Sequence, residues 1–268
     1  MQKFGIIEDT LFIPMLGRIY ASERYPHILY DEAALALKQK LPKDVLESGR
    51  HSQYTLLASA ARAANMDRYI KDFLTRRPDG IIAQLGCGLE TAYFRNENET
   101  TRWYAIDLPN VIAYRRSLLP QAQREHCIAG NAFTGEWIKR IRADAPKAPL
   151  LVTAGGLFYY FQEERILALL RMLQKTGNVE LVFDAVNRRG MTMLRRKYLK
   201  QMGHAQAQMY FYVDCAAALT AKLDESACVL ADEPYYRRIP KTGLQLSTQC
   251  AMAISDKFGM LRMIQLRL

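Results

Sequence analysis

The sequence predicts an α/β fold, a doubly wound and mostly parallel sheet covered by helices on both faces. Two observations support this prediction. Four short apolar runs lie between residues 81 and 186, and a helical stretch follows each of them. Strands that alternate with helices form βαβ units, and such units build parallel sheets. At 268 residues the chain is long enough for one large core without a metal or disulfide staple.

The elements follow in order along one domain, residues 1–268. Residues 1–78 are expected to form a helical N-terminal cap, because apolar residues recur at helical spacing between 31 and 77, and Asp31 is placed to cap the first of these helices. Residues 79–186 are expected to form the core. Its strands are predicted near 81–85, 103–107, 148–156 and 179–186, and its helices near 89–95, 109–119 and 162–174.

The second half of the chain is expected to cover the core and complete the sheet. Residues 187–225 return to a helical pattern and suit a lid inserted between late strands. Residues 226–268 are expected to contain two more strands, near 227–231 and 261–268. No apolar run reaches the ~18 residues that a membrane span needs. The first residues have acids where a signal peptide is apolar, so a cytoplasmic protein is expected.

The strongest local signal is the segment Ile81–Thr91, where a buried-strand pattern leads into a Gly-x-Gly turn. Gly86 and Gly88 allow a bound ligand close to the backbone. Asp107 follows at the end of the next predicted strand, where a carboxylate can accept hydrogen bonds from both hydroxyls of a ribose. A Gly-x-Gly pair also occurs in ordinary βα turns, but together with Asp107 it indicates a cofactor that contains adenosine.

The choice of cofactor depends on Thr91. Thr91 occupies the position of the third glycine in the dinucleotide fingerprint. In that fingerprint the glycine allows a helix to pack closely under a pyrophosphate. S-adenosylmethionine has no phosphates and makes no such demand. The incomplete fingerprint therefore favours a methyltransferase over an NAD(P)-dependent oxidoreductase, which stays open as an alternative.

The ordered motifs LGCGLET, WYAIDLPNVI, TAGGLFYYFQEERILALL and LVFDAV resemble the leucine carboxyl methyltransferase family, particularly its bacterial branch of polyketide-tailoring O-methyltransferases. The resemblance runs from about Thr10 to Val186 and again at the terminal strand. It implies a class I S-adenosylmethionine-dependent methyltransferase with a Rossmann-like, mostly parallel seven-stranded sheet, a helical N-terminal extension and a helical lid insertion.

The resemblance also implies roles for individual residues. Gly86, Cys87 and Gly88 would form the loop under the methionine part of the cofactor. Asp107 would hold the ribose, with Leu108 beside the adenine.

The resemblance implies further cofactor-binding positions, and at two of them this sequence departs from the family pattern. Arg62 lies where the family has an arginine for the cofactor's carboxylate, a role that suits a guanidinium. Asn131, with Ala132 beside it, replaces a usual acid near the adenine amino group. Ala154 and Gly155 replace a frequent acid-glycine pair after the fourth predicted strand, a departure that concerns the acceptor side of the site.

The reaction expected is methyl transfer from S-adenosylmethionine to an oxygen, a carboxylate or hydroxyl, of a small-molecule acceptor. Tyr159 is a candidate for the acceptor pocket, but no catalytic base and no metal site is identified, and the oligomeric state is open. The net charge of +10 leaves nucleic-acid binding through residues 188–200 as a third hypothesis. Basic residues near the cofactor motifs (Arg62, Arg95, Arg115, Arg116) and in the predicted lid suit an anionic acceptor at least as well.

Overall fold

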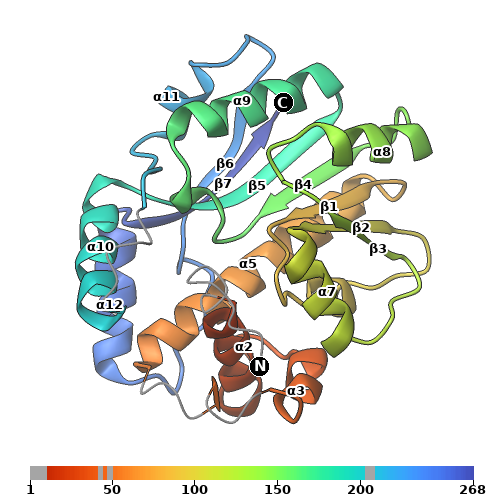
Figure 1. Ribbon diagram of the computed structural model, residues 1–268. Coiled ribbons are helices and arrows are strands. Elements are labelled where there is room, and N and C mark those ends of the chain that lie inside the picture. Colours follow the sequence, from red (N-terminus) through yellow and green to blue (C-terminus); the bar gives the residue numbers. More distant parts are fainter. Residues whose placement is uncertain (1–10, 42–44, 47–50, 203–208) are drawn as a thin grey trace.

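The computed structural model describes residues 11–41, 45–46, 51–202 and 209–268, and within α10 it describes side chains only up to residue 196. Seven strands form one sheet in the order β3-β2-β1-β4-β5-β7-β6, as Figure 1 shows. All neighbouring strands are parallel except β7, which runs antiparallel to β5 and β6. The strands are β1 Ile81–Leu85, β2 Arg102–Asp107, β3 Glu125–Ala129, β4 Leu150–Ala154, β5 Val179–Val186, β6 Cys228–Pro234 and β7 Leu261–Arg267.

Helices cover both faces of this sheet. On one face α8 (Glu136–Asp144) and α9 (Glu163–Thr176) bury Trp137, Ile141 and Leu170 against alternate residues of β1, β4 and β5. On the other face the long helix α5 (Gln53–Arg76) packs against the intervening residues, among them Ile82, Leu151 and Val182. The remaining helices are α6 Ala92–Arg95, α7 Pro109–Leu118, the 3₁₀ turn η1 Phe158–Tyr160, α10 Arg188–Met202, α11 Ala216–Thr220 and α12 Leu246–Lys257.

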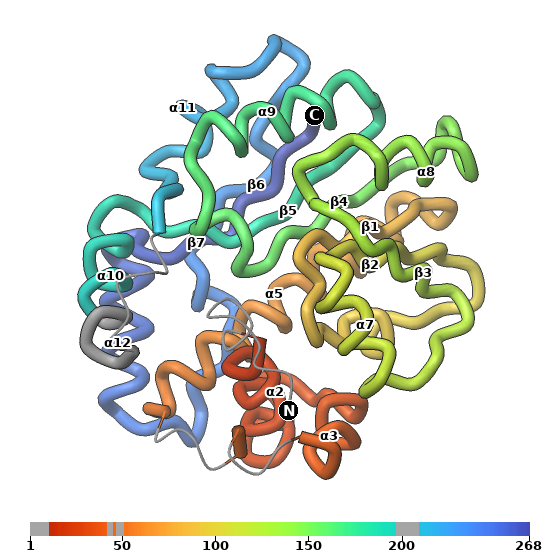
Figure 2. Tube along the Cα trace, in the orientation of Figure 1, coloured from red at the N-terminus to blue at the C-terminus, as the bar shows by residue number. Residues whose placement is uncertain are grey.

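The N-terminal cap consists of α2 (Phe12–Arg24), α3 (Glu32–Lys38) and α5. In the view of Figure 2, α2 and α3 lie below the sheet, and α5 runs from them up to it. The predicted N-cap is confirmed, because the Asp31 carboxylate accepts a hydrogen bond of 2.9 Å from the Ala34 N–H at the start of α3. The expectation of a cytoplasmic protein rests on residues 1–10, which lie outside the described residues.

The doubly wound mostly parallel sheet is confirmed, and four elements are additions to the prediction. The apolar pattern predicts no strand at β3, which is only five residues long and has one buried side chain. Helices α2, α8 and α12 were not predicted separately. Between β6 and β7, α12 shows that the segment 226–268 contains a helix as well as the final strands.

The connection order predicts a ligand-binding crevice at the carboxyl ends of the central strands. From β1 the chain goes to β2 and β3 on one side, and it returns to β4 and β5 on the other. In doubly wound sheets, ligands bind outside the carboxyl ends of the strands at such a reversal point. The loops after β1, β2, β4 and β5 meet there.

Candidate cofactor site

The loop after β1 has the backbone conformation that its glycines predict. Gly86 has φ = 61° and Gly88 has φ = 48°, backbone angles that residues with a side chain rarely adopt. A Cβ atom on Gly86 would also lie 2.8 Å from Leu157 Cδ1 in the loop after β4. Glycine is therefore required at both positions, and it brings the two loops into contact at the crevice.

Asp107 lies at the end of β2 and fixes the same loop. Its Oδ2 accepts a hydrogen bond of 2.7 Å from the Gly88 N–H, and its Oδ1 accepts one of 2.7 Å from the Leu108 N–H. Burial raises the pKa of the Asp107 carboxyl, although both N–H groups oppose that rise. Each oxygen has a second lone pair, so both remain able to accept from ribose hydroxyls.

Two buried arginines bind the carbonyl groups of this loop. Arg115 on α7 donates to Gly88 O at 3.1 Å and to Glu90 O, while Arg18 on α2 donates to Leu89 O at 2.7 Å. Both arginines are 1% exposed. The loop is thus held through its N–H groups by β2 and through its carbonyl groups by α7 and the N-terminal cap.

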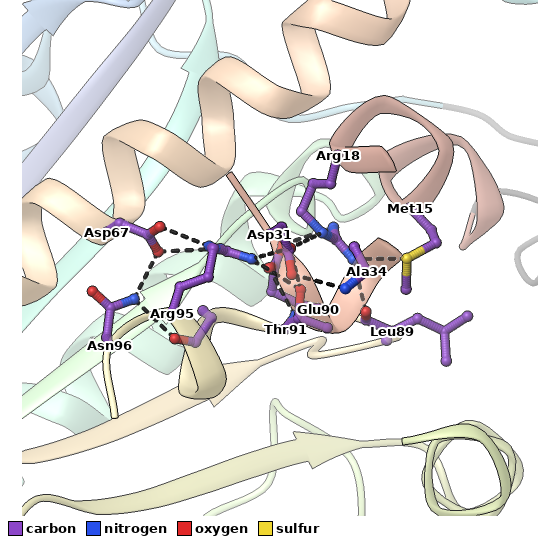
Figure 3. A network of polar contacts seen from close by, with 12 residues as sticks. Met15, Arg18, Asp31, Ala34, Asp67, Leu89, Glu90, Thr91, Arg95 and Asn96 are labelled. Carbon is purple, nitrogen blue, oxygen red and sulfur yellow. Dashed lines mark hydrogen bonds and ion pairs between the residues drawn. The ribbon is translucent and has the colours of Figure 1, made fainter. Parts of the chain in front are cut away.

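Figure 3 shows the network of ion pairs that joins the cap to this loop. Asp31 accepts from Arg95 at 2.6 Å and lies 3.2 Å from Arg18, and Glu90 accepts from Arg18 and Arg95 at 2.9 Å each. Asp67 on α5 binds the Arg95 Nε at 2.7 Å. Burial by itself would raise the pKa of Glu90, but the two arginines outweigh it and lower that pKa to about 2.

Thr91 explains the departure from the dinucleotide fingerprint. Its side chain is fully buried and its hydroxyl donates to Asp31. The place that the fingerprint reserves for a third glycine is therefore filled by a contact with the N-terminal cap, and the loop is built around that cap.

The arginine predicted to meet the cofactor carboxylate also lies at the crevice. Arg62 on α5 has a side chain that is 21% exposed, and its Nη1 lies 3.3 Å from Asp184 Oδ2 at the end of β5. Burial alone would lower the pKa of Arg62, but the attraction of Asp184 outweighs it and raises that pKa. Gly155 lies against the same side chain, because a Cβ there would be 3.4 Å from Arg62 Cδ.

The other predicted positions differ in what they can offer a ligand. Leu108, next to Asp107, is 45% exposed. Its side chain therefore offers an apolar surface on which an adenine ring could lie. Asn131 Oδ1 accepts from the Phe133 N–H at 2.9 Å, and Ala132 O accepts from Trp137 Nε1 at 2.9 Å. Ala154 is fully buried in the core and offers no exposed atom to a ligand.

Cys87 and Tyr159 are both buried, and neither side chain faces open solvent. Burial raises the pKa of the Cys87 thiol well above its ordinary value, which keeps it protonated and unreactive. Tyr159 is 6% exposed, and its hydroxyl donates to Asp184 Oδ2 at 2.7 Å. Its role in an acceptor pocket stays a prediction.

Two of the arginines that suited an anionic acceptor have internal partners instead. Arg95 is paired with Asp31, Asp67 and Glu90, and Arg115 is paired with Glu125 at 2.6 Å. Their charge is balanced inside the protein. The sequence analysis did not identify Arg18 or Asp184. Their importance comes from contacts with distant segments, which no local motif signals.

The described residues contain no group of three or more histidines, cysteines or acids placed to hold a metal ion. Among the described helices, none is both long and apolar enough to cross a membrane.

The sheet order, its antiparallel β7 and the glycine loop facing Asp107 define the class of Rossmann-like methyltransferase folds. A putative methyltransferase from Thermobifida fusca has this fold, with a TM-score of 0.57 and 14% identity over 94% of both chains. The magnesium protoporphyrin IX methyltransferase of Synechocystis, solved with bound S-adenosylhomocysteine, matches with a TM-score of 0.53 and 12% identity over 96% of this chain and 100% of that one.

The sequence places the protein more closely. A profile of the leucine carboxyl methyltransferase family matches residues 12–174, more than half of the chain, so the protein belongs to this family of S-adenosylmethionine-dependent methyltransferases. The tetracenomycin polyketide synthesis O-methyltransferase TcmP of Streptomyces glaucescens is 28% identical over 185 residues. That match spans 67% of this chain and 66% of the relative, just under two thirds of its length.

Proposed function

We propose that the protein transfers a methyl group from S-adenosylmethionine to an oxygen of a small-molecule acceptor. The observation that carries the proposal is the glycine loop at the reversal point of the sheet, fixed by Asp107, with both carboxylate oxygens able to accept further hydrogen bonds. Family membership and the similarity to an O-methyltransferase of polyketide synthesis support the same reaction.

The residues present fit this cofactor. Asp107 would hold the ribose, Leu108 would lie against the adenine, and Asn131 would accept from the adenine amino group through the free lone pair of its amide oxygen. Arg62 would bind the carboxylate of the methionine part with the guanidinium nitrogens that Asp184 does not occupy. The bound cofactor supplies an activated methyl group on a sulfonium.

The protein's own contribution is to bind and orient. Holding acceptor and methyl group in line, in a site closed to water, can lower a barrier by roughly 7 to 11 kcal/mol. A carboxylate acceptor needs no base, whereas a hydroxyl acceptor requires a group that takes its proton. The exposed Arg189 and Arg196 on α10, in the predicted lid, support an acceptor with negative charge.

The assignment of Asp107 can be tested by calorimetry with S-adenosylhomocysteine. Replacing Asp107 with Ala removes the ribose acceptor and frees the Gly88 N–H, so affinity should fall roughly 10- to 100-fold, since hydrogen bonds to a charged group contribute about 1.5 to 3 kcal/mol. Asp72→Ala, on the exposed side of α5, is the matched control and should bind as the unaltered protein does. Equal affinity of the Asp107 variant would refute the ribose contact.

A thermal-shift experiment separates this function from the alternative oxidoreductase. S-adenosylhomocysteine at about 100 times its Kd should stabilise the protein by about 2.7 kcal/mol, and NAD(P) should have no effect. Stabilisation by NAD(P) alone would overturn the proposal.

A further inference from the structure

A buried carboxylate at the end of β5 connects three elements of the crevice. Asp184 is 2% exposed, and its Oδ1 accepts a hydrogen bond of 2.6 Å from the Gly156 N–H in the turn after β4. Its Oδ2 accepts from the Tyr159 hydroxyl at 2.7 Å and lies 3.3 Å from Arg62 Nη1 on α5. A carboxylate with this little exposure is stable only when it is paired and hydrogen-bonded, and here it is both.

Gly156 allows the arginine to lie against the turn. Its φ of 69° favours glycine, and a Cβ atom there would lie 2.6 Å from Arg62 Nη1 and 2.9 Å from Cζ. The turn therefore leaves room for a flat guanidinium, and Asp184 binds both the guanidinium and the N–H of the same turn. Within the described residues, Asp184 is the side chain that hydrogen-bonds Arg62.

The contact with Tyr159 extends the connection toward the predicted lid. The Tyr159 ring packs with Val186, Met191 of α10 and Met209. Its carbonyl oxygen accepts a hydrogen bond of 2.7 Å from the Tyr210 N–H. Asp184 thus lies between the part of the crevice next to Arg62 and the segments that follow β5.

We propose that Asp184 is a positioning residue, which holds the Arg62 guanidinium and the turn at Gly156 in the orientation that receives the carboxylate of the cofactor. This inference rests on the proposed function. The carboxylate at this turn comes from the neighbouring strand β5. Fixing Arg62 in advance removes the cost of ordering a long side chain when the ligand binds.

The test is a double-mutant cycle for S-adenosylhomocysteine affinity, measured by calorimetry. Asp184→Asn keeps an oxygen for the Gly156 N–H but loses the charge that orients Arg62, so Kd should rise about 3- to 10-fold, the cost of ordering one long side chain. In an Arg62→Met background the same change should alter Kd less than twofold, because a residue that acts through Arg62 has nothing left to position. A purely structural role would give the same loss in both backgrounds.

Asp232→Asn is the matched control. Asp232 is also a strand carboxylate paired with an arginine, Arg262 at 2.6 Å, but it lies on β6. It should leave Kd unchanged in both backgrounds. Each variant is checked for folding by thermal unfolding, and Asp184→Glu, which keeps the charge but displaces it, replaces Asp184→Asn in the cycle if the latter does not fold.

The outcomes separate the two proposals. If the unaltered protein binds neither S-adenosylmethionine nor S-adenosylhomocysteine, the proposed function fails. If it binds and a folded Asp184 variant has a Kd within twofold of it, or loses equal affinity in both backgrounds, only the positioning role is overturned.

Discussion

Glu90 shows at the scale of a single residue how a buried ion pair makes the cofactor loop sensitive to pH. Arg18 and Arg95 lower its pKa from 4.5 to about 2. A carboxyl with a depressed pKa in the folded state stabilises the protein fully above its ordinary pKa, and this stability is lost as the pH falls toward about 2. The cofactor loop should therefore loosen in acid.

Replacing Glu90 with Gln tests this effect. At pH 7 the free energy of unfolding should fall on the order of 3 kcal/mol, the equivalent of the pKa shift, and the difference from the unaltered protein should shrink steadily between about pH 4.5 and pH 2. Urea unfolding followed by circular dichroism at several pH values measures both.

The control for this change is Glu23→Gln. Glu23 pairs with Lys38 on the surface, where both side chains are more than a third exposed, so its loss should cost less than about 1 kcal/mol at any pH. If Glu90→Gln lowers the free energy of unfolding by the same amount at every pH, the assigned ion pairs are contradicted.

Residues whose role is local could be predicted from the sequence, and residues whose role is tertiary could not. Gly86, Gly88 and Asp107 lie in a strand–turn–helix pattern that has a known geometry. Arg115 was visible as a basic residue, but its partner Glu125 and the loop carbonyl groups lie on other elements. Charge counted along the chain does not show which arginines are already paired.

At the scale of elements, α2 is the helix that ties the cap to the cofactor loop. Arg18 reaches Leu89 O and Glu90 from this helix, about 70 residues away in sequence. Replacing Arg18 with Met would leave Asp31 and Glu90 short of a cation, a loss that typically costs about 3 to 5 kcal/mol in a buried cluster. We expect the backbone amides of α2 and of the loop after β1 to exchange hydrogen faster in this variant, as measured by mass spectrometry.

Arg24→Met on the same helix is the control, because Arg24 is exposed in the last turn. It should leave exchange in the loop unchanged. Faster exchange confined to α2, with the loop unaffected, would show that the two elements are not coupled.

The central strands have the clearest sequence pattern, because each is a mostly apolar run. β1, β4 and β5 are buried on both faces, and every residue in them is buried. β3 lies at the sheet edge with polar and exposed positions, so its pattern is weak. The outward face of α12 includes Leu246 and Ile254, which are 78% and 50% exposed, and these blur its helical periodicity.

For the whole molecule, the net charge of +10 does not by itself indicate nucleic-acid binding, because a basic helix such as α10 is usually a solvated face. Arg18, Arg95 and Arg115 are each buried and paired with acids, so they cannot contact a polynucleotide. We expect no retardation of DNA or RNA in a gel at ~50 mM salt. Retardation that weakens steeply with added salt would instead indicate a phosphate-binding surface.

Besides Asp107, two fully buried side chains, Arg18 and Arg115, hold the loop after β1 from the side away from the proposed ligand. This has a consequence for engineering the protein to accept altered cofactors. The glycines cannot be exchanged, because their conformation and close contacts exclude side chains. Room for a larger substituent on the cofactor sulfonium would have to come from replacing Arg18 or Arg115, which bind the carbonyl groups of the loop. Libraries aimed at these two positions and their acidic partners would vary the shape of the loop without replacing any residue proposed to touch the ligand.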